Sequence, residues 1–188
     1  MLRFLILLLL AVPAAAQRYD LKLAAPPAGF AWQPLPQAKA AVLLPAGWHY
    51  RAEGTRAAPT YYLTPEAVGE SGEFAMGLSL QVVRKATVRT RHSAAEYAEL
   101  LMLRTGFGPG RQRLEKASSV EGAWHCRTVR YREAAPDDEA RIIYQLVLAN
   151  ARTDTLYLLT FESPEKDWPA AWVLGEVMVR EWVLDSRQ

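Results

Sequence analysis

Hydrophobic residues recur at every second position through much of the chain, which is the pattern of half-buried β-strands. The longest such run covers residues 74–82, where Phe74, Met76, Leu78, Leu80 and Val82 alternate with small or polar residues. Shorter runs of the same kind indicate further strands at residues 30–32, 41–44, 48–52, 60–64, 112–117 and 123–132. Turn residues separate several of them, as in Pro45-Ala46-Gly47 and Glu121-Gly122, so the pattern predicts strands joined by hairpins.

Two later strands, at residues 141–149 and 155–161, are apolar on both faces. In the first, Tyr144 and Leu146 occupy one face, while Ile143 and Val147 occupy the other. A strand that is apolar on both faces requires cover on both sides of its sheet. The sequence therefore predicts a sheet with packing layers above and below it.

Two segments have helical periodicity and can supply that cover. Ser93 and Glu96 form a capping box, which predicts a helix over residues 94–105. Ser163-Pro164 is expected to open a last helix. Its buried stripe recurs at intervals of three and four residues: Trp168, Trp172, Gly175, Val179 and Trp182. The predicted class is mixed α/β (α+β), a single three-layer α/β/α sandwich around a mostly antiparallel central sheet.

The N-terminal segment has the features of a secretory signal peptide. Arg3 precedes an apolar run, and Ala14-Ala15-Ala16 offers the small residues that signal peptidase requires. The expected organisation is a signal peptide over residues 1–16, a flexible arm over 17–29 and one domain over 30–188. The apolar run is too short for a membrane span. We therefore expect cleavage after Ala16, with the mature protein periplasmic or secreted.

Composition excludes several classes of function. The 188 residues are 51% hydrophobic and 22% charged, which fits a folded globular protein. The net charge of +2 is too small for a general nucleic-acid binder. The single cysteine excludes an intramolecular disulfide and a multi-cysteine zinc site.

Catalytic and cofactor motifs are not evident. His49, His92 and His125 lack the spacing of a metal site, and no cofactor is expected. Cys126 follows His125, but neighbouring strand residues point to opposite faces, so this imidazole is badly placed to activate the thiol. A buried, inert thiol is the favoured interpretation. A small hydrolase or redox-active protein using Cys126 remains the alternative.

Charge is distributed unevenly along the chain. Residues 84–132 contain 11 basic and 4 acidic side chains, while residues 133–188 contain 5 basic and 11 acidic ones. We expect Arg130 and Arg132 to share a strand face and hypothesise that they meet Arg89 and Arg91 in a basic patch. Such a patch could bind an acidic partner or an anionic surface. Alternatively, the basic and acidic segments interleave on folding and cancel.

The order of elements carries a resemblance to a known superfamily. The residues that carry it are Pro45, Gly47, Trp48, the strand at 74–83, the helix start at 93–101 and the Trp-rich segment 168–182. In these features the chain resembles the PsbP/DcrB-like superfamily over residues 30–184. The resemblance implies an α/β/α sandwich and a binding role, since its members share no catalytic constellation. The sequence therefore predicts an exported, non-enzymatic binding or accessory protein that docks on another extracytoplasmic protein.

Overall fold

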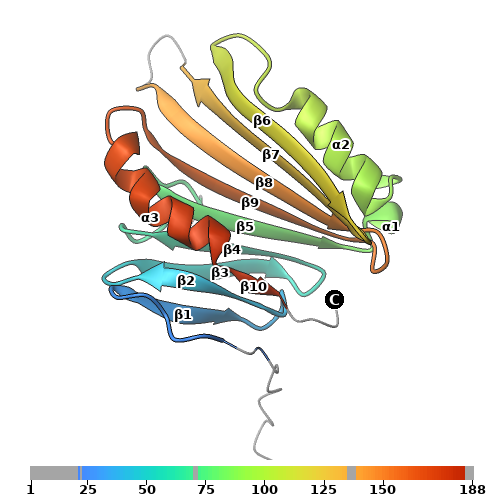
Figure 1. Cartoon of the computed structure of the whole chain (residues 1–188), viewed down its shortest axis with the longest axis horizontal. Coiled ribbons are helices and arrows are strands. Elements are labelled where there is room, and N and C mark those ends of the chain that lie inside the picture. The colour runs from blue at the N-terminus through green and yellow to red at the C-terminus, as the bar shows by residue number, and fades with distance from the viewer. Residues whose placement is uncertain (1–20, 22, 70–71, 135–138, 185–188) are drawn as a thin grey trace, which may run out of the picture.

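A seven-stranded antiparallel sheet forms the centre of the protein (Figure 1). The computed structural model describes Leu21 and residues 23–69, 72–134 and 139–184, so the predicted signal peptide lies outside the described residues. The strands of the large sheet follow the order β3-β4-β5-β9-β8-β7-β6. Their bounds are β3 His49–Thr55, β4 Ala58–Thr64, β5 Gly77–Arg84, β6 Arg111–Glu121, β7 Trp124–Glu133, β8 Arg141–Asn150 and β9 Thr155–Pro164.

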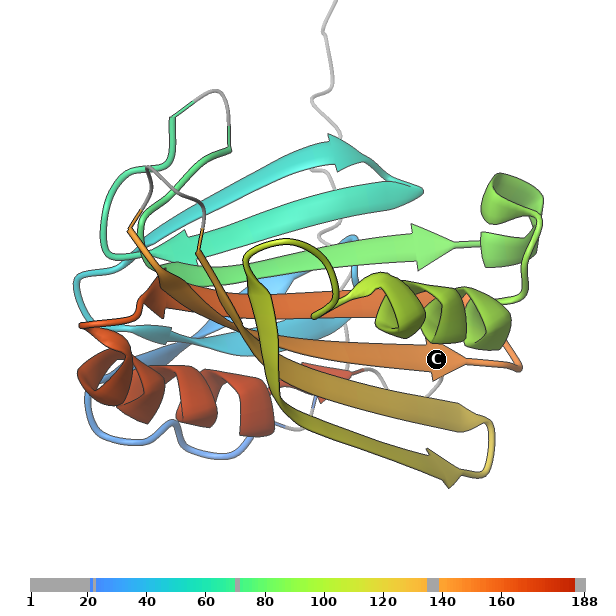
Figure 2. The same ribbon diagram turned by 90° about the horizontal axis from the view of Figure 1, so that it is seen from above.

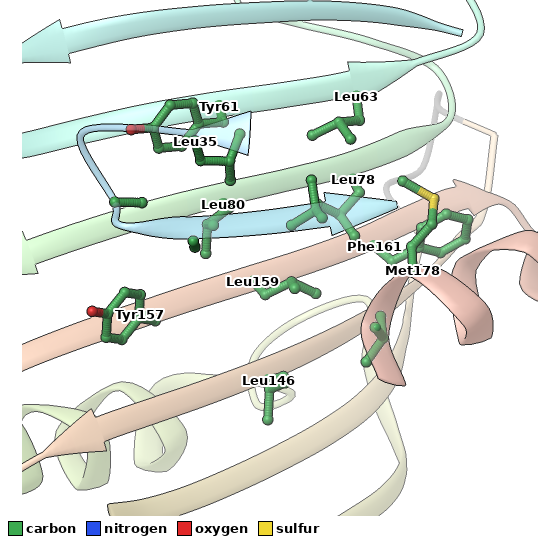
Figure 3. Close-up of a cluster of buried hydrophobic side chains, with 14 of the residues drawn as sticks. Leu35, Tyr61, Leu63, Leu78, Leu80, Leu146, Tyr157, Leu159, Phe161 and Met178 are labelled. Carbon is green, nitrogen blue, oxygen red and sulfur yellow. The ribbon is translucent and has the colours of Figure 1, made fainter. Parts of the chain in front are cut away.

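A small sheet and the last helix cover one face of the large sheet. The small sheet has the order β1-β2-β10, with β1 Phe30–Leu35, β2 Ala40–Pro45 and β10 Val183–Leu184. Helix α3 (Trp168–Arg180) packs beside it. Figure 3 shows the core that results, in which Leu35 of β1 and Met178 of α3 meet apolar side chains of β4, β5, β8 and β9.

Two helices pack against the opposite face. They are α1 (Ala86–Thr90) and α2 (Ala94–Arg104). Ala98 and Met102 of α2 are buried against Val129, Ile143 and Val147. The predicted capping box is present, because the Ser93 hydroxyl accepts from the Glu96 N–H and the Glu96 carboxylate accepts from the Ser93 N–H. This helix and its role as cover are confirmed.

The mixed α/β class and the antiparallel pairing are also confirmed, but three boundaries were wrong. Helix α3 ends at Arg180, so Trp182 of the predicted stripe lies beyond it. Strand β9 continues through Ser163-Pro164, where Pro164 pairs with Arg141, so α3 begins at Trp168 and not at Ser163. Phe74 precedes β5, because the Glu66 carboxylate accepts the N–H groups of Ala75 and Met76 and holds this segment as a loop.

The sequence did not predict α1 or β10. It also did not predict that β1 and β2 belong to a sheet separate from the large one. The predicted arm partly falls in the described region, and there the Trp32 indole donates a hydrogen bond to the Ala24 carbonyl oxygen at 2.7 Å. Within the described part of the chain, no helix is long and apolar enough to cross a membrane.

Candidate docking surface

The four arginines of the hypothesised basic patch do not come together. Arg130 and Arg132 do share one face of β7, as expected from strand alternation. Their guanidinium groups pair with Glu115 at 3.1 Å and Glu165 at 2.8 Å. Both ion pairs lie on the face of the sheet that carries α3.

The other two members of the hypothesised patch lie at the opposite end of the large sheet. Arg89 lies in the last turn of α1 and Arg91 is its C-cap, on the face that carries α2 (Figure 1). The assumption that Arg89, Arg91, Arg130 and Arg132 converge is therefore wrong, because the strand places two of them on one face and the helix places two on the other. Whether any of them binds a partner stays a prediction.

Cys126 lies on the α3 face of β7, while His125 points to the α2 face. Burial raises the pKa of the Cys126 thiol, and a hydrogen bond with the Ser119 side chain and the charge of Arg127 only partly oppose this. A raised pKa favours the protonated thiol, which is a poor nucleophile. Among the described residues, no group of three or more His, Cys, Asp and Glu side chains could hold a metal ion.

Part of the α3 face remains uncovered. Helix α3 contacts β9 and β2, and in Figure 1 it leaves β7 and β6 without a helix on this side. The half-exposed side chains there form what we call the open face: Trp124, Cys126 and Thr128 of β7, Tyr144 and Leu148 of β8, and Trp172 of α3. Apolar and aromatic groups thus lie accessible on the face that elsewhere forms the main core.

Aromatic contacts mark both ends of the open face. At one end the Trp172 ring lies 4.8 Å from the Tyr144 ring. At the other end, the centre of the Trp124 ring lies 6.3 Å from that of Tyr157, and the centre of the Tyr157 ring lies 5.8 Å from that of Trp182. Tyr144 pairs with Arg130, six residues along β7 from Trp124, so the two ends lie roughly 20 Å apart at about 3.3 Å per residue.

Polar groups lie between and beside these aromatic ends. Burial raises the pKa of the Tyr144 hydroxyl, the nearby Cys126 adds to this, and a hydrogen bond with the Thr128 side chain opposes it. The Arg130–Glu115 ion pair borders the same region. The open face therefore combines aromatic area with a few hydroxyl groups and one ion pair, which is suited to recognition and offers no activated nucleophile.

Strand β6 continues this surface to the edge of the sheet. All eleven of its residues are exposed, and in the described structure it pairs with β7 alone (Figure 2). On the α2 side, the Arg113 guanidinium lies 4.6 Å from the centre of the Phe107 ring. Lys116 projects to the same side of β6, and neither Arg113 nor Lys116 has an ion pair with a described residue.

Sequence reasoning did not identify Phe107, Arg113 or Lys116 as surface determinants. A signal was present, because residues 111–121 contain only Leu114 and Val120 as large apolar side chains. That composition is typical of an exposed edge strand. The sequence predicted a strand at residues 112–117 and indicated the positive charge of the segment, but it did not identify this strand as an exposed edge.

Comparison with known proteins identifies the fold. No protein-family model matches the sequence, and no curated protein matches it. The solution structure of cyanobacterial PsbP (CyanoP) from Synechocystis sp. PCC 6803 is similar, with a TM-score of 0.52 and 16% identity, over 84% of this chain and 93% of that one. The Saccharomyces cerevisiae Ran-binding protein Mog1p has a TM-score of 0.49 and 16% identity, over 84% of this chain and 96% of that one. The chain has a PsbP-like fold, as the resemblance noted in the sequence predicted.

Proposed function

We propose that this chain is an exported, non-enzymatic accessory protein that docks on another extracytoplasmic protein through the open face and the adjoining β6 strand. We also assign the domain to the three-layer α/β/α class, with the small sheet sharing one outer layer with α3. Similarity to CyanoP supports this assignment, since that fold similarity covers most of both chains.

The observation that carries the functional proposal is the accessible aromatic surface between α3 and β6. Trp124, Tyr144 and Trp172 are only partly buried, although α3 and the small sheet cover the same sheet face over β4, β5 and β9. Aromatic residues and arginine are enriched in protein interfaces and contribute most of the energy at hot spots. With Arg130 at its border, the open face has the composition of a docking surface.

The chemistry of Cys126 argues against the hydrolase or redox alternative. Its thiol is partly buried with a raised pKa, and the neighbouring His125 lies on the other side of the strand. A nucleophilic cysteine requires the opposite arrangement, with a lowered pKa and a base within hydrogen-bonding reach.

Export is proposed from residues 1–16, which have the charge, apolar run and small residues of a signal peptide. Expression of the full chain in a Gram-negative host, followed by intact-mass measurement of the periplasmic fraction, tests this. We expect a mass for a chain that starts at Gln17. Material that keeps Met1, or that stays in the cytoplasmic fraction, would contradict export.

Site-directed photo-crosslinking in the native host tests the docking proposal. A photoreactive amino acid at Thr128 lies on the open face, and one at Val88, which is 80% exposed on α1, serves as the matched control. We expect a discrete adduct with one exported protein from position 128 and no adduct from position 88. Equal adducts at both positions, or none at 128 in a folded variant, would contradict docking through this face.

A further inference from the structure

Strand β6 is a long free edge of the large sheet. In an antiparallel edge strand, alternate residues direct their N–H and C=O groups away from the sheet, where an incoming strand can pair with them. The opposite edge, β3, is shorter, and its Arg51 binds the loop that follows β4 through the carbonyl oxygens of Val68 and Gly69. Of the two edges of the large sheet, β6 is therefore the more accessible template.

The regular part of β6 runs from Glu115 to Glu121. A register shift lies between Arg113 and Glu115, and beyond it each residue pairs in sequence with β7, ending at Trp124. Neither proline nor glycine interrupts these seven residues. The bulge, and Lys116 at the middle of β6 as a whole, discourage indiscriminate pairing at this edge. A strand added here must therefore match both features.

Charge on the α2 side of this edge is positive. Arg113 and Lys116 both project to that side, and neither forms an ion pair in the described structure. On the α3 side, by contrast, Glu115 is paired with Arg130. Phe107, whose ring lies against Arg113, adds apolar area beside the cations, with an exposed fraction of 53%. The complementary strand would carry carboxylates on the side facing these two cations, interspersed with apolar residues.

A second copy of the chain is a poor occupant of the same edge. Two β6 strands paired over the whole regular stretch would meet about Ser118, with Glu115 of each copy opposite Glu121 of the other. A pairing centred on Lys116 would place that lysine opposite itself. Like charges directly opposite one another destabilise a strand pair.

We propose that β6 accepts an extended acidic segment of the docked partner as an additional strand, with its carboxylates opposite Arg113 and Lys116. Main-chain hydrogen bonds supply affinity in this mode of recognition, and the side chains supply selectivity. The inference rests on the proposed docking function and names the chemistry of the partner's segment.

Binding of synthetic peptides to the folded protein tests this proposal by fluorescence anisotropy. The probe is a labelled ten-residue peptide of alternating Glu and Val, compared with a Lys–Val peptide and with a Glu–Val peptide interrupted by proline. We expect the Glu–Val peptide to bind and the Lys–Val peptide not to bind. The peptide interrupted by proline should bind with an affinity at least about tenfold lower than that of the Glu–Val peptide. Equal binding of the acidic and basic peptides would overturn the proposal.

Charge reversal on the protein gives the second arm. The double variant Arg113→Glu/Lys116→Glu should weaken binding of the Glu–Val peptide by about tenfold. Arg56→Glu makes the same kind of change on an exposed residue of the β3–β4 turn, at the opposite edge of the large sheet, and should leave binding unchanged. If Arg56→Glu weakens binding as much as the double variant, the attraction is general and the assigned edge is wrong.

Backbone hydrogen exchange locates the contact and separates this proposal from the docking function. We expect the peptide to slow exchange in residues 115–121. Protection of that stretch that grows with protein concentration alone would mean self-pairing, and binding to phosphatidylglycerol vesicles without binding of the peptide would mean a lipid surface; either overturns the proposal. A partner crosslinked at Thr128 with β6 unprotected would overturn the added strand while leaving docking intact.

Discussion

Gly175 of α3 lies directly against the ring of Phe161 on β9. A methyl group on the Gly175 α-carbon would stand 2.7 Å from the ring carbons, closer than packed atoms approach. Phe161 is itself fully buried and contacts Trp168 and Trp172, so its ring has little room to move. The glycine in the predicted tryptophan stripe thus allows the helix to approach the sheet.

Gly175→Ala should therefore destabilise the protein. Overpacking costs about 1–3 kcal/mol, and the better helix propensity of alanine returns up to about 1 kcal/mol, so we expect a net loss of about 1–2 kcal/mol in urea unfolding. Val173→Ala, at an exposed position of the same helix, should change stability by less than about 0.5 kcal/mol. The double variant Gly175→Ala/Phe161→Leu should lose less stability than the sum of the losses of the two single variants, because the smaller side chain relieves the clash. Additive losses would refute the contact.

Residue periodicity predicted the elements whose packing is set by the sheet itself. Strands β8 and β9 are apolar on both faces because Leu146 and Phe161 enter one core while Val147 and Leu156 enter the other. Because such strands need cover on both faces, the sequence also correctly predicted that α2 covers the sheet. Periodicity could not reveal β10, since two residues, Val183 and Leu184, carry no pattern and pair with β2 only through the tertiary fold.

The candidate surface was harder to predict than the fold. Alternation placed Arg130 and Arg132 on one side of a strand, but nothing in the local sequence indicated that Glu115 and Glu165 would lie within ion-pairing distance of them. Glu165 is more than thirty positions from Arg132 in the chain. It comes close to Arg132 because it directly follows β9, and β9 lies only two strands from β7 in the sheet. Long-range pairing of this kind decides which charges remain available to a partner.

Asp154 joins both helices of the α2 face to the β8–β9 turn. Its carboxylate accepts the N–H of Thr87 at 2.8 Å and the N–H of Ala94 at 2.9 Å. Burial raises the pKa of this carboxyl, but these hydrogen bonds outweigh it and hold the pKa below the ordinary value of 3.8. The ionised form is therefore favoured by folding.

Asp154→Ala should lower stability at neutral pH, because two helix N-termini lose an acceptor. The sign of the pH dependence follows from the lowered pKa. The stabilisation is complete above the unfolded pKa and is lost as pH falls through the folded one. The difference in urea midpoint between wild type and variant should thus narrow below about pH 4. A difference that stays constant or widens on acidification would contradict this role.

Cys126 offers a direct test of the catalytic alternative. Because burial raises its thiol pKa, iodoacetamide should modify Cys126 more slowly in the folded protein than in urea at the same pH. Intact mass against time measures the rate, and Cys126→Ser should show no cysteine modification. Faster modification in the folded state would indicate an activated thiolate and would favour the hydrolase or redox interpretation over docking.

Arg141 of β8 forms an ion pair with Glu162 of β9. Burial raises the pKa of Glu162, the guanidinium of Arg141 at 3.3 Å opposes this, and the charge of Glu133 adds to it. Arg141 also donates hydrogen bonds to the carbonyl oxygens of Phe74 at 3.1 Å and Ala75 at 2.8 Å.

Arg141→Ala removes the positive charge that stabilises the Glu162 carboxylate and should raise the pKa of Glu162 further. A carboxyl whose folded pKa is raised costs stability once pH exceeds its unfolded pKa, because folding then requires either protonation or a buried charge. The stability lost by Arg141→Ala should accordingly be greater at pH 7 than at about pH 4, as measured by urea unfolding. Adding Glu162→Gln should abolish that pH-dependent part and leave only the constant loss of the two backbone hydrogen bonds. If the loss were the same at both pH values, Arg141 would act on the loop alone and the ion pair would contribute nothing.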